Sequence, residues 1–366
     1  MKWLGKLLLY TLCIGNLLLT GGMLLVAYSP RLHPVSHPLL SSIGLTFPFF
    51  VIANLLYLFF WWGVEQFKIS LLSLAGLILC FSDIRTLCPI HLIPSDIPKE
   101  SIKLLSYNVM GFNGCEKTNG RNEILSYLVN SDADIICLQE YATSGDAKQH
   151  LTQKDVDKAL KEYPYKALSM HGKRGHKGLA CYSKFPLLST KAVSYKSSYN
   201  GSAVYQLKIG NDTVTLINNH LESNKLTKQD KVVYEELLKA PEKEKMKSGV
   251  RQLLTKLAEA SALRSKQAEE IARQVKMAED RPVLVCGDFN DIPLSYTYHT
   301  IRQDILNDAF EDSGTGPGIS YNQHHFYFRI DHILTSRHWE AYDCTVDRSI
   351  KESDHYPIWS KLLYKE

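Results

Sequence analysis

The chain has 366 residues, and its 42 Lys and Arg against 38 Asp and Glu give a formal net charge of +4. Residues 1–98 hold five of the basic and three of the acidic residues, which leaves 37 against 35 elsewhere, a net charge of +2. Dedicated nucleic-acid-binding proteins usually have a larger basic excess, so charge does not favour that class. The net charge does not exclude small phosphorylated molecules or lipid headgroups as substrates. The eight cysteines include no CxxC pair, which argues against a disulfide framework and a zinc site.

Three apolar segments come first in the chain, at Leu7–Tyr28, Leu39–Trp62 and Ile69–Leu87. Each has about 19 to 24 residues, close to the ~20 that a helix needs to cross a hydrocarbon core. The first segment is long for a signal peptide and further segments follow it, which favours an uncleaved anchor over a cleaved signal. We therefore predict a membrane region with about three transmembrane helices at residues 1–88 and a linker at residues 89–100.

The orientation in the membrane follows from the basic residues beside these segments. Lys2 and Lys6 favour an N-terminus in the cytoplasm. Three spans then place the rest of the chain outside the cytoplasm, and this multi-pass arrangement is the one we predict. Because Asp83 and Arg85 lie near the end of the third segment, two spans remain the alternative, and the rest of the chain would then lie in the cytoplasm.

Residues 101–366 alternate between strand and helix patterns. In chain order, we predict a strand at Ile102–Val109, a helix at Arg121–Asn130, a strand at Asp134–Leu138, a helix at Lys154–Glu162, strands at Gly178–Ser183, Ala203–Ile209 and Thr213–Asn219, a helix at Val250–Ala278, a strand at Pro282–Val285, a helix at Tyr298–Leu306, a strand at Arg329–Leu334 and a strand at Tyr356–Leu363. This order predicts an α/β (α+β) four-layer sandwich, in which two packed mixed β-sheets are flanked by helices.

The segment 222–279 has no clear place in this pattern. We expect its long helix to pack on a sheet, with a break near Pro241 and Gly249 and a solvated loop at Glu242–Lys247. A lid or membrane-facing insertion that selects the substrate is the alternative. The basic segment Lys173–Gly178 also has two interpretations, a solvated loop, which is favoured, and a contact to a substrate phosphate.

Six short polar motifs follow one another along residues 101–366, and most come directly after an apolar strand. They are Ser106-Tyr107-Asn108-Val109, Leu138-Gln139-Glu140, Asn218-Asn219-His220-Leu221, Gly287-Asp288-Phe289-Asn290, Arg329-Ile330-Asp331-His332 and Ser353-Asp354-His355. Acids, amides and imidazoles at the ends of buried strands cost desolvation energy, so they are expected to meet one another or a metal. Such a set in one cleft suits a hard divalent cation acting on a phosphate ester.

Together the motifs resemble those of the endonuclease/exonuclease/phosphatase superfamily, the deoxyribonuclease-I-like fold, over about Ile102 to Leu362. The resemblance implies a phosphoesterase that uses Mg²⁺ or Mn²⁺. It implies the following roles: Glu140 as the principal metal ligand, with Asn108 beside it and Asp354 close by; Asp288 and Asn290 as the pair that positions the attacking water and holds the phosphoryl oxygens; His355, oriented by Asp331, at the scissile phosphate; and His220 on the other side of the phosphate.

Single motif residues also have structural explanations. Asn108 could simply end a strand, Asp288-Phe289-Asn290 could form a polar turn before Pro293, and His220 could be a hydrogen-bonded strand-end histidine. His332 follows Asp331 in an alternating strand, and we expect it to point away from the site.

We therefore predict a membrane-anchored, monomeric hydrolase whose substrate is a nucleic acid, a phospholipid headgroup or a sugar phosphate. A sphingomyelinase-like lipid phosphodiesterase is one alternative. A non-catalytic binding or scaffolding module on the same fold is the other, and it would be expected to have lost several motif positions. None of the core positions is lost.

Overall fold

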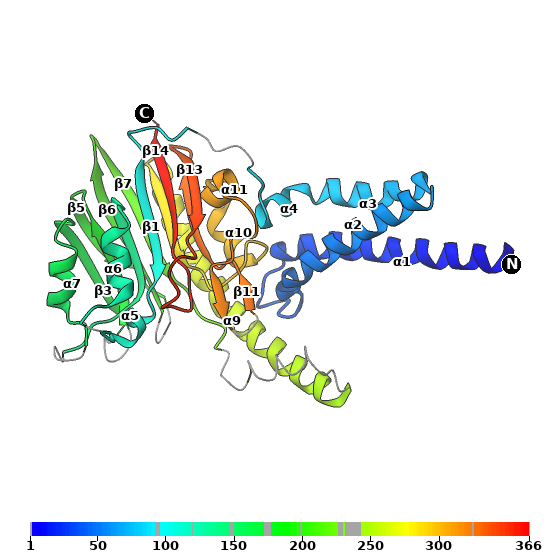
Figure 1. The fold of residues 1–366 in the computed structure, drawn as a ribbon, viewed down its shortest axis with the longest axis horizontal. Helices are drawn as coiled ribbons and strands as arrows, with labels where there is room; N and C mark the ends of the chain where they lie inside the picture. The colour runs from blue at the N-terminus through cyan, green and yellow to red at the C-terminus, as the bar shows by residue number, and fades with distance from the viewer. Residues whose placement is uncertain are drawn as a thin grey trace.

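The computed structural model describes residues 2–91, 96–118, 120–145, 150–171, 177–195, 197, 200–225, 230, 243–323 and 326–365. A group of apolar helices at the N-terminus extends to one side of a body built from two β-sheets (Figure 1). The chain therefore has the order that the sequence predicts, with helices first and the mixed α and β region after them.

The body contains two six-stranded sheets, with strand orders β13-β14-β1-β2-β4-β3 and β5-β6-β7-β8-β12-β9. The first sheet consists of β1 (Ile102–Asn108), β2 (Ile135–Tyr141), β3 (Tyr165–His171), β4 (Lys177–Ser183), β13 (Trp339–Val346) and β14 (Ile358–Tyr364). The second consists of β5 (Leu187–Ala192), β6 (Gly201–Ile209), β7 (Asp212–His220), β8 (Val283–Asp288), β9 (Leu306–Asp308) and β12 (Asp331–Ser336). Both sheets are mixed, since β1 and β2 pair in parallel, as do β7 and β8, within otherwise antiparallel sheets.

The two sheets pack face to face around a central apolar core that contains Leu104 of the first sheet and Leu284 of the second. Their outer faces are covered by helices. The first sheet packs on α6 (Glu123–Asn130) and α7 (Gln153–Ala159), and the second on α9 (Lys243–Met277) and α10 (Tyr296–Arg302). The four-layer sandwich is thus confirmed.

The smaller elements of the body lie at its edges and ends. They are α5 (Met110–Gly114), α11 (Ala309–Ser313) and the hairpin formed by β10 (Tyr321–Gln323) and β11 (Phe326–Phe328).

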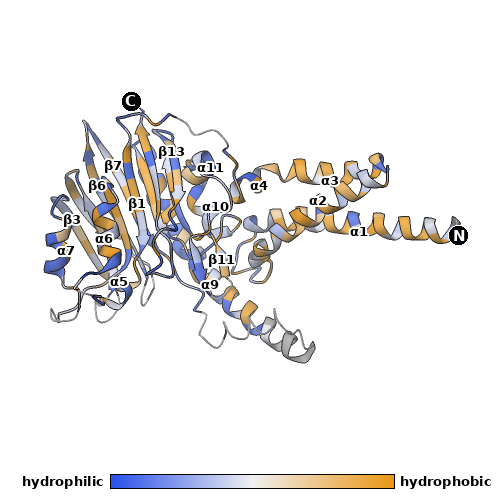
Figure 2. Ribbon diagram, viewed as in Figure 1, coloured by the Kyte–Doolittle hydropathy of each residue, from blue (hydrophilic) through white to orange (hydrophobic). Residues whose placement is uncertain are grey.

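The N-terminal part consists of α1 (Lys2–Tyr28), η1 (Ser29–Arg31), η2 (Leu40–Thr46), α2 (Phe47–Gly63), α3 (Phe67–Leu79) and α4 (Phe81–Leu87). Among the described residues, the segments Trp3–Arg31 and Leu40–Gly63 are long and apolar enough to cross a membrane. The pair α3 and α4 is bent by 58° and makes a third candidate if it is one span. In Figure 2 the ribbon of these helices is coloured mostly for hydrophobic residues.

A buried polar cluster joins the first three of these long helices. Asn16 of α1 accepts a hydrogen bond from the Trp61 indole of α2 (2.8 Å) and donates one to Ser73 of α3 (2.8 Å). The helices also approach closely at Gly76, where an added Cβ would lie 2.5 Å from the Thr20 side chain. The third helix therefore packs in the same bundle as the other two, whichever number of spans it makes.

The observed elements differ from the predicted ones in three respects. The sequence pattern does not predict β3, β5, β9, β13 or the β10–β11 hairpin; β5, for example, is exposed over almost its whole length and lacks apolar alternation. The helix predicted at Tyr298–Leu306 ends at Arg302, because Gln303 has a φ of 49°, which is not helical.

The third difference concerns α9. The charge run predicted as a solvated loop is helical from Lys243 onward, and Gly249 does not break the helix. Lys and Glu are strong helix formers, and a single internal glycine costs only about 1 kcal/mol, which the neighbouring residues offset. Pro241 and residues 172–176 and 324–325 lie outside the described residues.

Candidate active site

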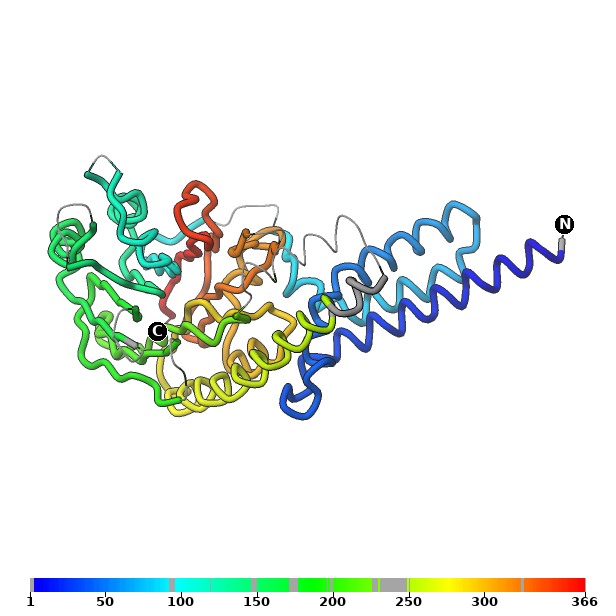
Figure 3. Tube along the Cα trace, turned by 90° about the horizontal axis from the view of Figure 1, so that it is seen from below, coloured from blue at the N-terminus to red at the C-terminus, as the bar shows by residue number. Residues whose placement is uncertain are grey.

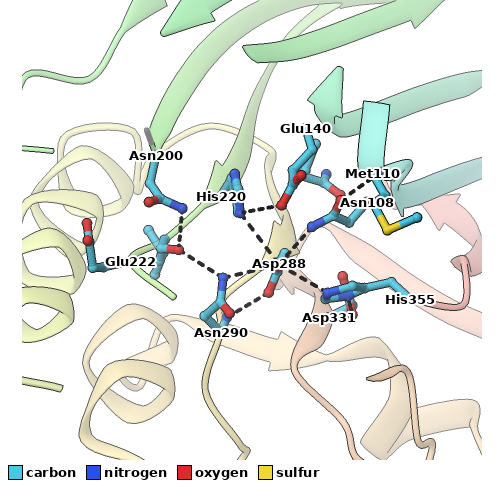
Figure 4. A network of polar contacts seen from close by, with 12 residues as sticks. Asn108, Met110, Glu140, Asn200, His220, Glu222, Asp288, Asn290, Asp331 and His355 are labelled. Carbon is cyan, nitrogen blue, oxygen red and sulfur yellow. Dashed lines mark hydrogen bonds and ion pairs between the residues drawn. The ribbon is translucent and has the colours of Figure 1, made fainter. Parts of the chain in front are cut away.

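Four of the predicted site residues lie at the same edge of the two sheets (Figure 4). Asn108 ends β1, His220 ends β7 and Asp288 ends β8, whereas Asp331 begins β12. Strand pairing places Asp288 directly beside both His220 and Asp331. Residues two or four positions away on the same strands belong to the central core, so the period-two alternation of strands directs all four side chains between the sheets.

His355 lies between two buried carboxylates. Its Nδ1 is 2.8 Å from Asp331 Oδ2, and its Nε2 is 3.6 Å from Asp288 Oδ2. Burial alone would lower the pKa of His355, but the charges of Asp331 and Asp288 outweigh it and raise the pKa well above its usual value. The histidine is therefore the positive group of this cluster. Burial raises the pKa of Asp288, and the charge of Asp331 adds to that effect.

Glu140 reaches the site through an irregularity in β2. Alternation alone would place its side chain on the outer face with Leu138, which packs against the helices. The register between β2 and β4 shifts between Leu138 and Tyr141, and Glu140 has a φ of 50°, in the left-handed region. This bulge redirects the carboxylate toward the site. Strained backbone of this kind is concentrated at functional positions.

Two groups contact the Glu140 carboxylate. Lys177 Nζ lies 2.5 Å from Oε2, and His220 Nε2 lies 3.8 Å from Oε1 and also 3.8 Å from Asp288 Oδ2. Burial would raise the pKa of Glu140, but His220 and Lys177 outweigh it and lower the pKa. Burial lowers the pKa of His220 to about 4, so His220 is neutral at pH 7.

Two amides hold Asp288 in place. Asn108 Nδ2 donates to Asp288 Oδ2 (3.1 Å), and Asn290 donates to Asp288 from its backbone N–H (2.8 Å) and from its side chain (3.1 Å). Asn290 Nδ2 also donates to the backbone oxygen of Leu221 (2.9 Å). Gly287, just before Asp288, has a φ of 125°, and a Cβ there would lie 2.0 Å from the Asn219 backbone oxygen. Only glycine fits at that position.

Seven of the eight predicted site residues thus lie in one network, namely Asn108, Glu140, His220, Asp288, Asn290, Asp331 and His355. The eighth, Asp354, precedes His355, and its backbone oxygen accepts a hydrogen bond from Asn322 (3.4 Å). Its assignment as a metal ligand stays a prediction. His332 is buried on the opposite face, where its Nε2 lies 3.0 Å from the Asp291 backbone oxygen, as the alternation predicts.

Comparison with protein families decides the identity. Residues 105–355, more than half of the chain, match the model of the Endonuclease/Exonuclease/phosphatase family. The chain belongs to the endonuclease/exonuclease/phosphatase family. Residues 6–87 match a second model, described as a domain of unknown function (DUF8431). Comparison with curated proteins gave no match.

Solved structures share the fold of this family member at low sequence identity. A humanized TDP2 of D. rerio with 14 mutations is 16% identical, with a TM-score of 0.51 over 72% of this chain and 100% of that chain. The human Nocturnin catalytic domain with a bound sulfate anion is also 16% identical, with a TM-score of 0.51 over 74% of this chain and 96% of that chain. D. rerio TDP2 complexed with a single-strand DNA product is 15% identical, with a TM-score of 0.50 over 72% and 100%.

Arg264 of α9, which belongs to none of the six motifs, supports the loops that carry the site residues. Its guanidinium, 3% exposed, bonds to Asp291 Oδ2 (3.1 Å), to the Glu222 backbone oxygen (2.9 Å) and to Asn224 Oδ1 (2.8 Å). It thus joins α9 to the loops after His220 and Asp288. The sequence does contain a sign of its burial, because Arg264 lies four residues before Ala268 and so falls on the apolar face of the helix, where a charged residue is unusual.

The residues present fit a divalent cation. Carboxylate oxygens of Asp288 and Asp331 lie within 4.8 Å of each other and of one ring nitrogen of His355, the positive group of the cluster. Asp331 Oδ1 is buried and has no hydrogen-bond partner in the described part of the chain. Glu140 adds a third carboxylate at the same edge. Carboxylate oxygens are the ligands that hard divalent cations prefer.

Proposed function

We propose that this protein is a divalent-metal-dependent hydrolase of phosphate esters, anchored in a membrane by its N-terminal helices. The main support is the buried set of Asp288, Asp331 and His355, in which His355 contacts both carboxylates. Burying two acids beside each other is unfavourable unless a positive group meets them. A fold retains such a set where a phosphate and its attacking water must be held.

The side chains have complementary roles in this proposal. Glu140 and Asn108, with Asp354 nearby, would hold Mg²⁺ or Mn²⁺, which supplies positive charge against the non-bridging phosphate oxygens. Asp288, oriented by Asn108 and Asn290, positions the attacking water and accepts its proton.

The two histidines act on the phosphate in different ways. His355, held by Asp331, donates its Nε2 proton toward the phosphate or the leaving oxygen. His220 is neutral and offers a hydrogen bond to the phosphate from the opposite side without adding charge.

The domain boundaries follow the same proposal. Residues 1–88 form the membrane region, 89–100 the linker and 101–366 the catalytic domain. Three spans would place the catalytic domain outside the cytoplasm. The two apolar helices and the buried polar cluster that binds α3 to them support this arrangement.

The non-catalytic alternative has less support. A scaffold would have no need for the strained backbone at Glu140 and Asn290, both of which have positive φ. A scaffold would also have no function for the buried charges of Asp288, Asp331 and His355, which cost desolvation energy.

The test is turnover by the purified full-length protein in detergent. With Mg²⁺, we expect hydrolysis of bis(p-nitrophenyl) phosphate or p-nitrophenyl phosphate, and loss of that activity in Asp288→Asn. The choice between the two probes distinguishes diester from monoester hydrolysis. Equal rates for the variant and the unaltered protein would contradict the mechanism.

A further inference from the structure

The N-terminal helices pack directly against the catalytic domain (Figure 3). An apolar cluster joins Met23 and Phe47 of the helices to Ile292 and Leu294 of the catalytic domain, and all four are buried. At Gly44, an added Cβ would lie 2.2 Å from the Leu294 backbone oxygen. Packing, and not only the linker, therefore sets the position of the catalytic domain relative to the helices.

Buried polar contacts reinforce this interface. Arg329 bonds to the Thr86 backbone oxygen of α4 and to Asp308 Oδ2 (2.9 Å). Thr86 Oγ1 in turn donates to Glu311 (2.9 Å). Because these groups are hidden from water, separation of the two parts would remove the hydrogen bonds that Thr86 makes to the Arg329 guanidinium and to the Glu311 carboxylate.

The segments that contact the helices also hold the active site. Ile292 follows Asn290 by two residues, and Ile330, which packs against the same cluster, directly precedes Asp331. Consecutive Cα atoms are about 3.8 Å apart, so the backbone at Asp331 and Asn290 lies within roughly 8 Å of residues that touch the helices. The site is therefore held next to the plane where the helices leave the catalytic domain.

The β10–β11 hairpin connects the site to the helices. The Tyr321 ring lies 5.1 Å from the His355 ring, and Phe328 packs against the helix-contacting cluster. Tyr327, which directly precedes Phe328 in β11, is 52% exposed. Tyrosine and tryptophan are enriched where proteins meet the headgroup region of a membrane.

We propose that the substrate is a phosphate ester of a lipid, taken from the bilayer that the N-terminal helices cross. This inference rests on the proposed phosphoesterase activity and anchoring. With the helices in the bilayer, the segments with Asp288 and Asp331 lie at headgroup level, so a lipid phosphate reaches them without leaving the membrane. The oxygen of water bonds to phosphorus, the ester P–O bond breaks, and the leaving oxygen takes up the proton that water loses.

The experiment uses the full-length protein in vesicles of phosphatidylethanolamine, phosphatidylglycerol and phosphatidic acid with Mg²⁺. The soluble arms are short-chain forms of the same lipids, a single-stranded oligonucleotide and bis(p-nitrophenyl) phosphate. We expect hydrolysis of a vesicle lipid at least about tenfold faster than of its short-chain form at equal concentration, because the anchored enzyme and its substrate share one surface.

Comparing the vesicle lipids with the soluble substrates distinguishes failure of the lipid-substrate proposal from failure of the proposed phosphoesterase activity. Turnover of the nitrophenyl ester with equal rates on long- and short-chain lipids, or with preference for the oligonucleotide, would overturn the lipid substrate and leave the phosphoesterase activity standing. Turnover of no probe would overturn both.

A variant tests whether the β10–β11 hairpin contacts the membrane. The measured quantity is the rate of hydrolysis of the vesicle lipid divided by the rate for its short-chain form. Tyr327→Ser should lower this ratio about tenfold, whereas Tyr327→Trp should keep it. Leu188→Ser is the matched control, because Leu188 is an exposed apolar residue (56%) of β5, on the far side of the sheets. An unchanged ratio in Tyr327→Ser, or an equal fall in Leu188→Ser, would contradict a membrane contact at the hairpin.

Discussion

The side-chain amide of Asn108 donates a hydrogen bond of 3.1 Å to Asp288, and this bond joins the first sheet to the second at the active site. Gln139 of the first sheet likewise donates to Asn218 of the second (2.7 Å). Neither sheet alone contains the complete network. The site therefore forms only when the two sheets are packed, and substitutions within it should be tested for folding as well as for activity.

Replacing the buried carboxylate of Asp288 should remove most of the activity. In Asp288→Asn we expect kcat to fall roughly 10²–10⁴-fold, because the amide cannot accept a proton from water. Steady-state kinetics on a nitrophenyl phosphate ester measure the change, and the thermal midpoint shows whether the variant is folded. A folded variant with normal kcat would exclude Asp288 as the base.

Asp331 should act through His355. Because the 2.8 Å contact orients the imidazole and stabilises its charged form, Asp331→Asn is expected to lower kcat about 10²–10⁴-fold with a much smaller effect on KM. Asp343→Asn, an exposed acid on β13, is the control and should leave both parameters unchanged. A change in KM alone would indicate that Asp331 contributes only to binding.

Replacing Glu140 and replacing Lys177 should change the apparent metal affinity in opposite directions. Chelation is expected to abolish activity, and Mg²⁺ or Mn²⁺ to restore it. Glu140→Gln should weaken the apparent metal affinity at least about tenfold. Lys177→Met should tighten it about two- to fivefold, since it removes a cation that pairs with the same carboxylate. Calorimetric titration measures both, and weaker binding in Lys177→Met would contradict this competition.

Stability should fall at acidic pH because of the buried pair Asp308–Arg329. Burial would raise the pKa of Asp308, but Arg329 outweighs it and holds the pKa below its usual value. The pair's contribution is therefore complete above the unfolded-state pKa of about 3.9 and is lost as the pH falls through the lower folded pKa.

The matching variant is Asp308→Asn. It should be less stable near neutral pH by roughly 3–5 kcal/mol, because Arg329 stays buried without its partner. Its stability should also depend less on pH below about 4. Denaturant titrations of both proteins in detergent provide the comparison, and parallel curves would show that Asp308 does not determine the acid sensitivity.

Arg264 should position the loops behind the site. Arg264→Met is expected to lower kcat about tenfold by releasing Asp291 and the backbone near Asn290. Arg273→Met is the control on the same helix, since Arg273 is 61% exposed and pairs with Glu270, three residues before it. Partial recovery in Arg264→Lys would indicate a positioning role, whereas equal losses in the control would indicate a general effect on α9.

Much of the site could be predicted because strand alternation is a local property. Each of the four strand-end residues lies an even number of positions from a core residue of the same strand, and each faces the space between the sheets. They are Asn108, His220, Asp288 and Asp331. Glu140 is different, since the same rule directs it outward, and only the bulge against β4 turns it to the site. The edge strands β3, β5, β9 and β13 and the extension of α9 through Gly249 are not predicted for a similar reason, because tertiary packing overrides weak local preferences.

Sequence patterns alone predict the family, the two-sheet architecture, the apolar helices at the N-terminus and most of the residues that meet at the site. These depend on short-range patterns of apolar and polar residues, which a chain shows without being folded. The three-dimensional packing places Glu140 beside Lys177, Arg264 behind the loops after His220 and Asp288, and Ile292 and Ile330 at the apolar cluster shared with the N-terminal helices. Such contacts join residues far apart in the chain, and their geometry results from the packing of whole layers.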